Sequence, residues 1–207
     1  MIPSICKIEV VSLKAIFLNK SLAFLTKYNN YSEEEKEKVL YGLEGIYLTF
    51  SKLFIIIALS IILGIFKEVL LLLLMFNVIR YFGFGIHAKK SIECLISSTL
   101  MFIVLPYIFL KLNTNNNILL ILSICGLISF IFFAPADTPK RPFYNKKKKI
   151  IRRILTISIG IIYLILSFVI KNEIISNLLL LSILLQAIVV NPITYKLMRQ
   201  TYNNSKK

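Results

Sequence analysis

Six long apolar blocks constrain the fold of this chain more than any other feature of the sequence. They are residues 45–66, 69–86, 95–110, 118–134, 154–170 and 174–192. Each is 16 to 22 residues long, which lets a helix rising about 1.5 Å per residue cross a bilayer core of about 30 Å. A barrel is excluded because its strands need alternating polar and apolar residues. The sequence therefore predicts an all-α, polytopic membrane helical bundle with about six transmembrane helices.

Composition excludes two other classes of protein. Hydrophobic residues make up 57% of the chain, whereas ordinary soluble domains contain about 45–50% apolar residues. The net charge of +15 does not indicate nucleic-acid binding, because the basic residues lie between the apolar blocks, where membrane proteins carry orienting charges. We therefore expect a single integral membrane domain over residues 1–207, with the lipid bilayer as its partner.

Lysine and arginine are distributed very unevenly between the two ends of these blocks. If the N-terminus is cytoplasmic, twenty of the 25 fall on the cytoplasmic side, in residues 1–44, 89–90, 135–153 and 193–207. The opposite side carries only Lys67, Lys111 and Lys171. Because positive charge accumulates on the cytoplasmic side, we expect a multi-pass protein of the cell membrane with both termini in the cytoplasm.

The first 42 residues mix apolar positions with lysines. This pattern resembles a basic amphipathic helix in the cytoplasm, lying either on the membrane surface or against the bundle. Ser32 and Glu35 have the spacing of a capping box, so a new helix is expected to begin there. Glu44 stands at the entrance of the first span, either paired with a basic residue or as a simple interfacial acid.

The cysteines and the histidine limit the chemistry available. Cys6, Cys94 and Cys125 are odd in number and widely spaced, which predicts neither a disulfide framework nor a zinc site. His87 is the only histidine and has no carboxylate cluster near it in the sequence. We therefore expect no cofactor and no metal.

A polar stretch from Arg80 to Cys94 holds the strongest candidate site. The predicted topology puts His87 and Cys94 at the cytoplasmic membrane face, and a thiol with an imidazole is the minimum equipment of a cysteine nucleophile and its base. Seven residues on a straight helix separate the two side chains by about 10.5 Å, too far for a hydrogen bond. A catalytic pair therefore requires the backbone to bend, which Gly83 and Gly85 permit.

Each of these residues also has a structural interpretation. A histidine at an interface serves as a polar anchor, and a cysteine serves as a small core residue. Gly83 and Gly85 allow close helix packing. Arg80 inside an apolar block is a functional-site candidate by default, or it extends to the nearby interface.

The stretch after the fourth block is the second unusual region. Three prolines within residues 135–142 predict a stiff, non-helical exit from the span. Asp137 is the only acid in a strongly basic loop, where it orients His87 or pairs with Arg141. The basic run 146–153 is typical of a topology anchor on anionic lipid.

In this combination and order, the motifs resemble the AgrB (accessory gene regulator protein B) family. These are membrane cysteine endopeptidases that process autoinducer peptide precursors in Gram-positive quorum sensing. The matching pieces are residues 41–44, Arg80, Gly83, Gly85, 87–89, Cys94, 134–137 and 140–142. The resemblance covers nearly the whole chain, with one departure: Phe84 separates the two glycines, which are commonly adjacent in the family.

The resemblance implies a mechanism and a partner. Cys94 would be the nucleophile and His87 its base, removing the C-terminal tail of a precursor peptide of the AgrD type through an acyl-enzyme thioester. The peptide would then cyclise to a thiolactone or lactone. Supporting roles would fall to Arg80, Gly83, Gly85, Asp137 and Glu44. Substrate contacts would fall to Lys89, Lys90, Lys146, Lys147, Lys148 and Lys149. A homodimer is a further family-level expectation.

Two alternatives need no covalent chemistry. A small membrane transporter or peptide exporter would use Arg80 and Lys52 as charges inside the membrane. A non-catalytic membrane scaffold would use the charges for topology alone. Neither needs Cys94, so substitution of this residue separates them from the peptidase.

Overall fold

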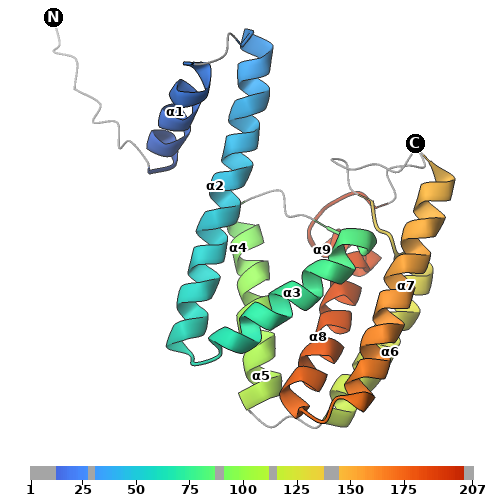
Figure 1. Cartoon of the computed structure of the whole chain (residues 1–207). Helices are drawn as coiled ribbons and strands as arrows, with labels where there is room; N and C mark the ends of the chain where they lie inside the picture. Colours follow the sequence, from blue (N-terminus) through green and yellow to red (C-terminus); the bar gives the residue numbers. More distant parts are fainter. Residues whose placement is uncertain (1–12, 28–30, 87–90, 112–115, 138–144, 203–207) are drawn as a thin grey trace, which may run out of the picture. The chain divides into compact units, whose positions relative to one another are not determined.

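The computed structural model describes residues 13–27, 31–86, 91–111, 116–137 and 145–202 (Figure 1). The helices are α1 (Leu13–Thr26), α2 (Glu33–Ile62), α3 (Phe66–Gly83), α4 (Ser91–Thr99), η1 (Leu100–Val104), α5 (Leu105–Lys111), α6 (Asn116–Phe133), α7 (Lys146–Val169), α8 (Glu173–Val190) and α9 (Pro192–Leu197). Helices and short connections account for all of the described residues, which confirms the all-α prediction.

Within the described residues, four helical segments are long and apolar enough to cross a membrane. They are Glu33–Ile62, Ile92–Leu110, Lys146–Val169 and Glu173–Val190, with α6 a shorter apolar helix. α3 also coincides with a predicted block, but Lys67, Glu68 and Arg80 reduce its apolar character. These helices support a membrane protein, and the topology of six crossings stays a prediction.

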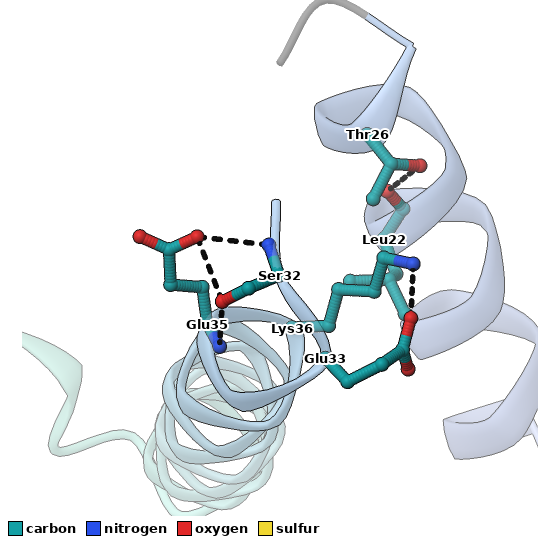
Figure 2. Close-up of polar contacts among 6 residues, drawn as sticks. All are labelled: Leu22, Thr26, Ser32, Glu33, Glu35 and Lys36. Carbon is teal, nitrogen blue, oxygen red and sulfur yellow. Dashed lines mark hydrogen bonds and ion pairs between the residues drawn. The ribbon is translucent and has the colours of Figure 1, made fainter. Parts of the chain in front are cut away.

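The chain divides into two compact units, residues 1–55 and residues 56–207. In the first unit, the predicted capping box is present at the start of α2. The backbone N–H of Ser32 donates to Glu35 Oε2 at 2.9 Å, and the N–H of Glu35 donates to Ser32 Oγ at 3.3 Å (Figure 2). These two bonds satisfy donors that a helix start leaves without partners, so α2 begins where the sequence predicts. Glu44 forms an ion pair with Lys14 of α1.

The N-terminal helix differs from the amphipathic helix that was expected. α1 exposes Ile16, Phe17 and Phe24 together with Asn19 and Lys20. Apolar residues two apart, such as 16 and 18, lie on nearly opposite sides of a helix with 3.6 residues per turn. The lysines therefore interrupt an apolar surface that surrounds α1, and they do not define one polar face opposite one apolar face. The remainder of the expected amphipathic segment, 1–12 and 28–30, lies outside the described residues.

The second unit is built around α8. Twelve of its 18 residues are buried, and α8 packs against α3, α6 and α7 (Figure 1). Ser123 of α6 donates its hydroxyl to the carbonyl of Leu180 at 2.9 Å, joining α6 to α8. The helix α7 exposes most of its apolar side chains, and α4 exposes Ile92 and Ile96, which suits surfaces that face lipid.

A π-helical turn lies between α4 and α5. The N–H of Leu105 donates to the carbonyl of Leu100, five residues earlier. Pro106 follows directly; it has no N–H, and in a regular helix its ring would clash with the carbonyl four residues earlier. The wider turn relieves this conflict, so the third apolar block continues as one helical segment from residue 91 to residue 111.

The prediction of a basic loop over residues 135–153 is wrong for its second half, because α7 begins at Lys146. The side chain of Asn145 accepts hydrogen bonds from the N–H groups of Lys147 and Lys148 at 2.9 and 3.3 Å. This helix cap is followed by lysines with good helix propensity. As a result, α7 begins about two turns before the fifth apolar block, which was predicted to start at residue 154. The non-helical exit after α6 is confirmed.

Candidate functional site

A strained turn ends α3 just before His87. Phe84 has φ +54° and Gly85 has φ +122°. The second value lies in a backbone region that residues other than glycine rarely adopt. A Cβ on Gly85 would lie 2.4 Å from Val189 Cγ1 and 2.9 Å from the Val189 carbonyl oxygen. The predicted irregularity of the backbone is therefore present, and it depends on Gly85.

Gly83 also allows close helix packing, the other interpretation of the glycine pair. A Cβ there would lie 2.6 Å from Gln186 Nε2 of α8 and 3.1 Å from Thr156 Cγ2 of α7. Its absence lets the last turn of α3 lie directly against α8. The two glycines thus have different roles.

The turn pairs with the segment that follows α6, some fifty residues later in the chain. The N–H of Ala136 donates to the Gly83 carbonyl, and the N–H of Gly85 donates to the Ala136 carbonyl, both at 3.1 Å. The N–H of Ile86 donates to the carbonyl of Val189 at 3.1 Å. Three separate parts of the chain therefore converge immediately before His87.

Two arginines in the second and third turns of α7 hold the ends of other helices. Arg152 donates to the carbonyl of Tyr81 at 2.9 Å, and its guanidinium lies 4.4 Å from the ring centroid of Phe84. Arg153 donates through Nε to the carbonyl of Ala134 at 2.7 Å. Positive charge at a helix C-terminus is favourable. These arginines therefore bind carbonyl groups at the C-terminal ends of α3 and α6, a role that the lipid-anchor interpretation did not include.

Arg80 points back onto the same turn. Its Nη2 donates to the carbonyl of Ile86 at 2.8 Å, and its guanidinium lies 5.5 Å from the ring centroid of Phe76. The side chain therefore braces the chain that leads into His87, and a functional role for Arg80 stays a prediction.

Asp137 is fully buried, unlike a solvated loop residue. The hydroxyl of Tyr195, on α9, donates to the backbone carbonyl of Asp137 at 3.2 Å. Burial raises the pKa of Tyr195, with Arg80 opposing and Asp137 adding to the shift. The Tyr195 hydroxyl is therefore a neutral donor at physiological pH.

Replacing Tyr195 with Phe should lower the free energy of unfolding by about 1–3 kcal/mol, because it removes a buried hydrogen-bond donor. Thermal unfolding in detergent micelles measures the effect. Tyr81→Phe is the matched control, since Tyr81 is 67% exposed and its contacts involve the ring and the backbone. Equal stability of Tyr195→Phe and wild type would contradict the role of this hydroxyl.

The remaining predicted residues lie on other helices or outside the described part of the chain. Cys94 lies in the first turns of α4 and is partly exposed, and Lys146, Lys147 and Lys148 are exposed at the start of α7. Glu44 belongs to the first unit. The predicted residues that lie outside the described part of the chain are His87, Lys89, Lys90, Arg141 and Cys6. Within the described part, no group of three or more His, Cys, Asp or Glu side chains is arranged to hold a metal ion.

Sequence reasoning missed Gln186, Arg152 and Tyr195 as individual members of this site. An uncharged amide inside an apolar block was the only signal for Gln186, because polar side chains are costly in a membrane. Arg152 was treated as one charge in a run. Nothing in the sequence distinguishes Tyr195 from the other nine tyrosines.

Comparison with known proteins gives a consistent result. The family model for AgrB, Accessory gene regulator B, matches residues 18–190. The accessory gene regulator protein B of Staphylococcus aureus (strain JH9) is 37% identical over 153 residues, covering 74% of this chain and 81% of the relative. An AgrB-like protein of Clostridium acetobutylicum is 32% identical over 196 residues, covering 95% and 89%. One from Listeria innocua is 33% identical over 178 residues, covering 84% and 86%. No solved structure matches the chain.

Proposed function

Because the chain belongs to the accessory gene regulator B family, and so to accessory gene regulator quorum sensing, we propose that it is a membrane-embedded cysteine endopeptidase. Cys94 is the nucleophile and His87 is its general base. The observation that supports this pair best is the interruption between α3, which ends at Gly83, and α4, which begins at Ser91. A straight helix would hold the two side chains about 10.5 Å apart along its axis, and the interruption removes that constraint.

The first stage cleaves the precursor peptide. His87 takes the proton of the Cys94 thiol, and the thiolate attacks the backbone carbonyl before the C-terminal tail. The tetrahedral intermediate then collapses: the C–N bond breaks, and the tail leaves as an amine that receives the proton from His87. The remainder of the peptide stays attached to Cys94 as a thioester.

The second stage closes a ring. A Cys thiol or Ser hydroxyl within the bound peptide loses its proton to His87 and attacks the thioester carbonyl. The bond between that carbon and Cys94 Sγ breaks, a thiolactone or lactone forms, and Cys94 takes the proton back from His87. Exchange of one thioester for another changes the free energy little, so a site that excludes water favours cyclisation over hydrolysis. The partner is a precursor of the AgrD type, and the steps use side chains of this chain together with backbone and side-chain groups of the precursor.

The start of α7 is suited to an acidic peptide tail. Lys146, Lys147 and Lys148 are exposed on consecutive positions, and attraction between exposed charges weakens as salt increases. Replacing residues 146–149 with glutamine should therefore slow precursor processing about threefold to tenfold in 50 mM salt and much less in 500 mM salt. Processing rates in liposomes of neutral lipid measure this without anionic headgroups.

Replacement of the same four lysines with arginine is the matched control, since it keeps the charge. It should process like the wild type at both salt concentrations. Glutamine variants that insert normally and process at the wild-type rate in low salt would show that α7 does not attract the tail.

Co-expression with a candidate precursor, followed by mass spectrometry, tests the proposed function. The expected products are a free C-terminal tail, a cyclic peptide that is lighter than its linear form by one water, and a thioester adduct on Cys94. Transport of intact precursor without cleavage would instead favour the exporter.

A further inference from the structure

Among the described residues of the second unit, Gln186 is the most deeply buried amide side chain. It lies on α8, has no exposed surface, and its Nε2 donates to the backbone carbonyl of Phe84 at 2.9 Å. Its Oε1 is buried and has no hydrogen-bond partner among the residues that the structure describes. An amide is costly at such a place unless its hydrogen bonds are used.

The carbonyl that Gln186 binds belongs to the turn before His87. Phe84 has φ +54°, and its side chain lies under the guanidinium of Arg152. Other polar backbone groups of the turn have partners of their own. The carbonyl of Gly83 and the N–H groups of Gly85 and Ile86 bind backbone atoms, and the carbonyl of Ile86 accepts from Arg80. Gln186 is therefore the side chain by which α8 holds the backbone of this turn in one orientation.

We propose that Gln186 is a positioning residue for the cysteine–histidine pair. By binding the Phe84 carbonyl, it fixes the direction in which the chain leaves α3 and enters His87. Reaction rates are sensitive to misplacement of a catalytic group by about 1 Å. This inference rests on the proposed function, and it predicts that loss of the amide reduces activation of Cys94 without weakening the binding of the precursor.

The test uses the full chain in detergent with Cys6 and Cys125 replaced by Ser, which leaves Cys94 as the only cysteine. The rate of alkylation by iodoacetamide at pH 7 is divided by the rate at pH 10. A thiol without an activating base is only a few per cent ionised at pH 7, so the ratio reports activation. Wild type should keep most of its rate at pH 7, and Gln186→Met should lower the ratio at least fivefold.

Processing kinetics supply the second measurement. Gln186→Met should lower kcat for the precursor tenfold or more and leave KM within twofold of the wild type. Ser182→Ala is the matched control, since Ser182 is equally buried on α8 but its hydroxyl donates to the carbonyl of Leu178 in the same helix and, among the described residues, not to the turn. It should behave as the wild type in both measurements.

Gly83→Ala tests the same contact from α3, because the added Cβ would lie 2.6 Å from Gln186 Nε2 and displace the amide. It should lower the alkylation ratio as Gln186→Met does, and it decides the question if Gln186→Met does not fold. A wild-type ratio in either folded variant overturns the inference. A wild-type ratio in His87→Ala would instead overturn the proposed function, because the histidine would then not activate Cys94.

Discussion

Cys94→Ala should abolish removal of the precursor's tail, with a loss of about 10⁴-fold or more in processing rate. The thioester cannot form without the thiol, and removal of a nucleophile is among the most damaging changes in enzymes that use one. His87→Ala should lower the rate by about 10²–10⁴-fold, the range typical of a general base. Mass spectrometry of the precursor after co-expression, with membrane insertion checked separately, measures both losses.

Cys125→Ala is the matched control for the nucleophile. Cys125 lies on α6 and is exposed on the surface of the helix, so its removal should leave processing at the wild-type rate. Accumulation of intact precursor in the Cys94 and His87 variants alone supports the peptidase. Continued cleavage by Cys94→Ala would show that the nucleophile is another residue or that the peptide is cut by another protein.

The helices were predictable because their signals are local. An apolar block long enough to cross a bilayer, the Ser32–Glu35 capping box and the prolines after residue 134 each act within a few residues of the chain. The structure follows these signals at the start of α2 and at the end of α6. The starts of α7 and α9 were less predictable, because side-chain caps by Asn145 and Asn191 let α7 begin before its apolar block and α9 form after the last one.

The turn before His87 was only partly predictable. Two glycines indicated an irregular backbone, and that irregularity is present at Gly85. Its partners were not predictable, since Ala136, Arg152 and Gln186 meet the turn from positions about 50 to 100 residues away in the chain. Such contacts depend on how α3, α6, α7 and α8 pack, and a single sequence carries no record of which helices are neighbours.

The same packing identifies Gly85 as the position where a small substitution should have the largest structural effect. Gly85→Ala should lower the free energy of unfolding by about 2–6 kcal/mol, combining the strain of φ +122° with overpacking against Val189. Val189 presents its backbone carbonyl oxygen 2.9 Å from the new Cβ, so a change of side-chain rotamer cannot relieve the clash. Thermal unfolding in detergent and precursor processing should both be affected.

Gly64→Ala separates the two causes. Gly64 also has a positive φ, +68°, but no atom lies within 4 Å of an added Cβ. It should therefore lose only about 1–2 kcal/mol, the cost of a left-handed conformation for an L-residue, and it should retain processing. If Gly85→Ala loses no more stability than Gly64→Ala, the close approach of α8 to the turn is not what holds the segment before His87. If Gly85→Ala folds but processes slowly, the turn matters more for positioning than for stability.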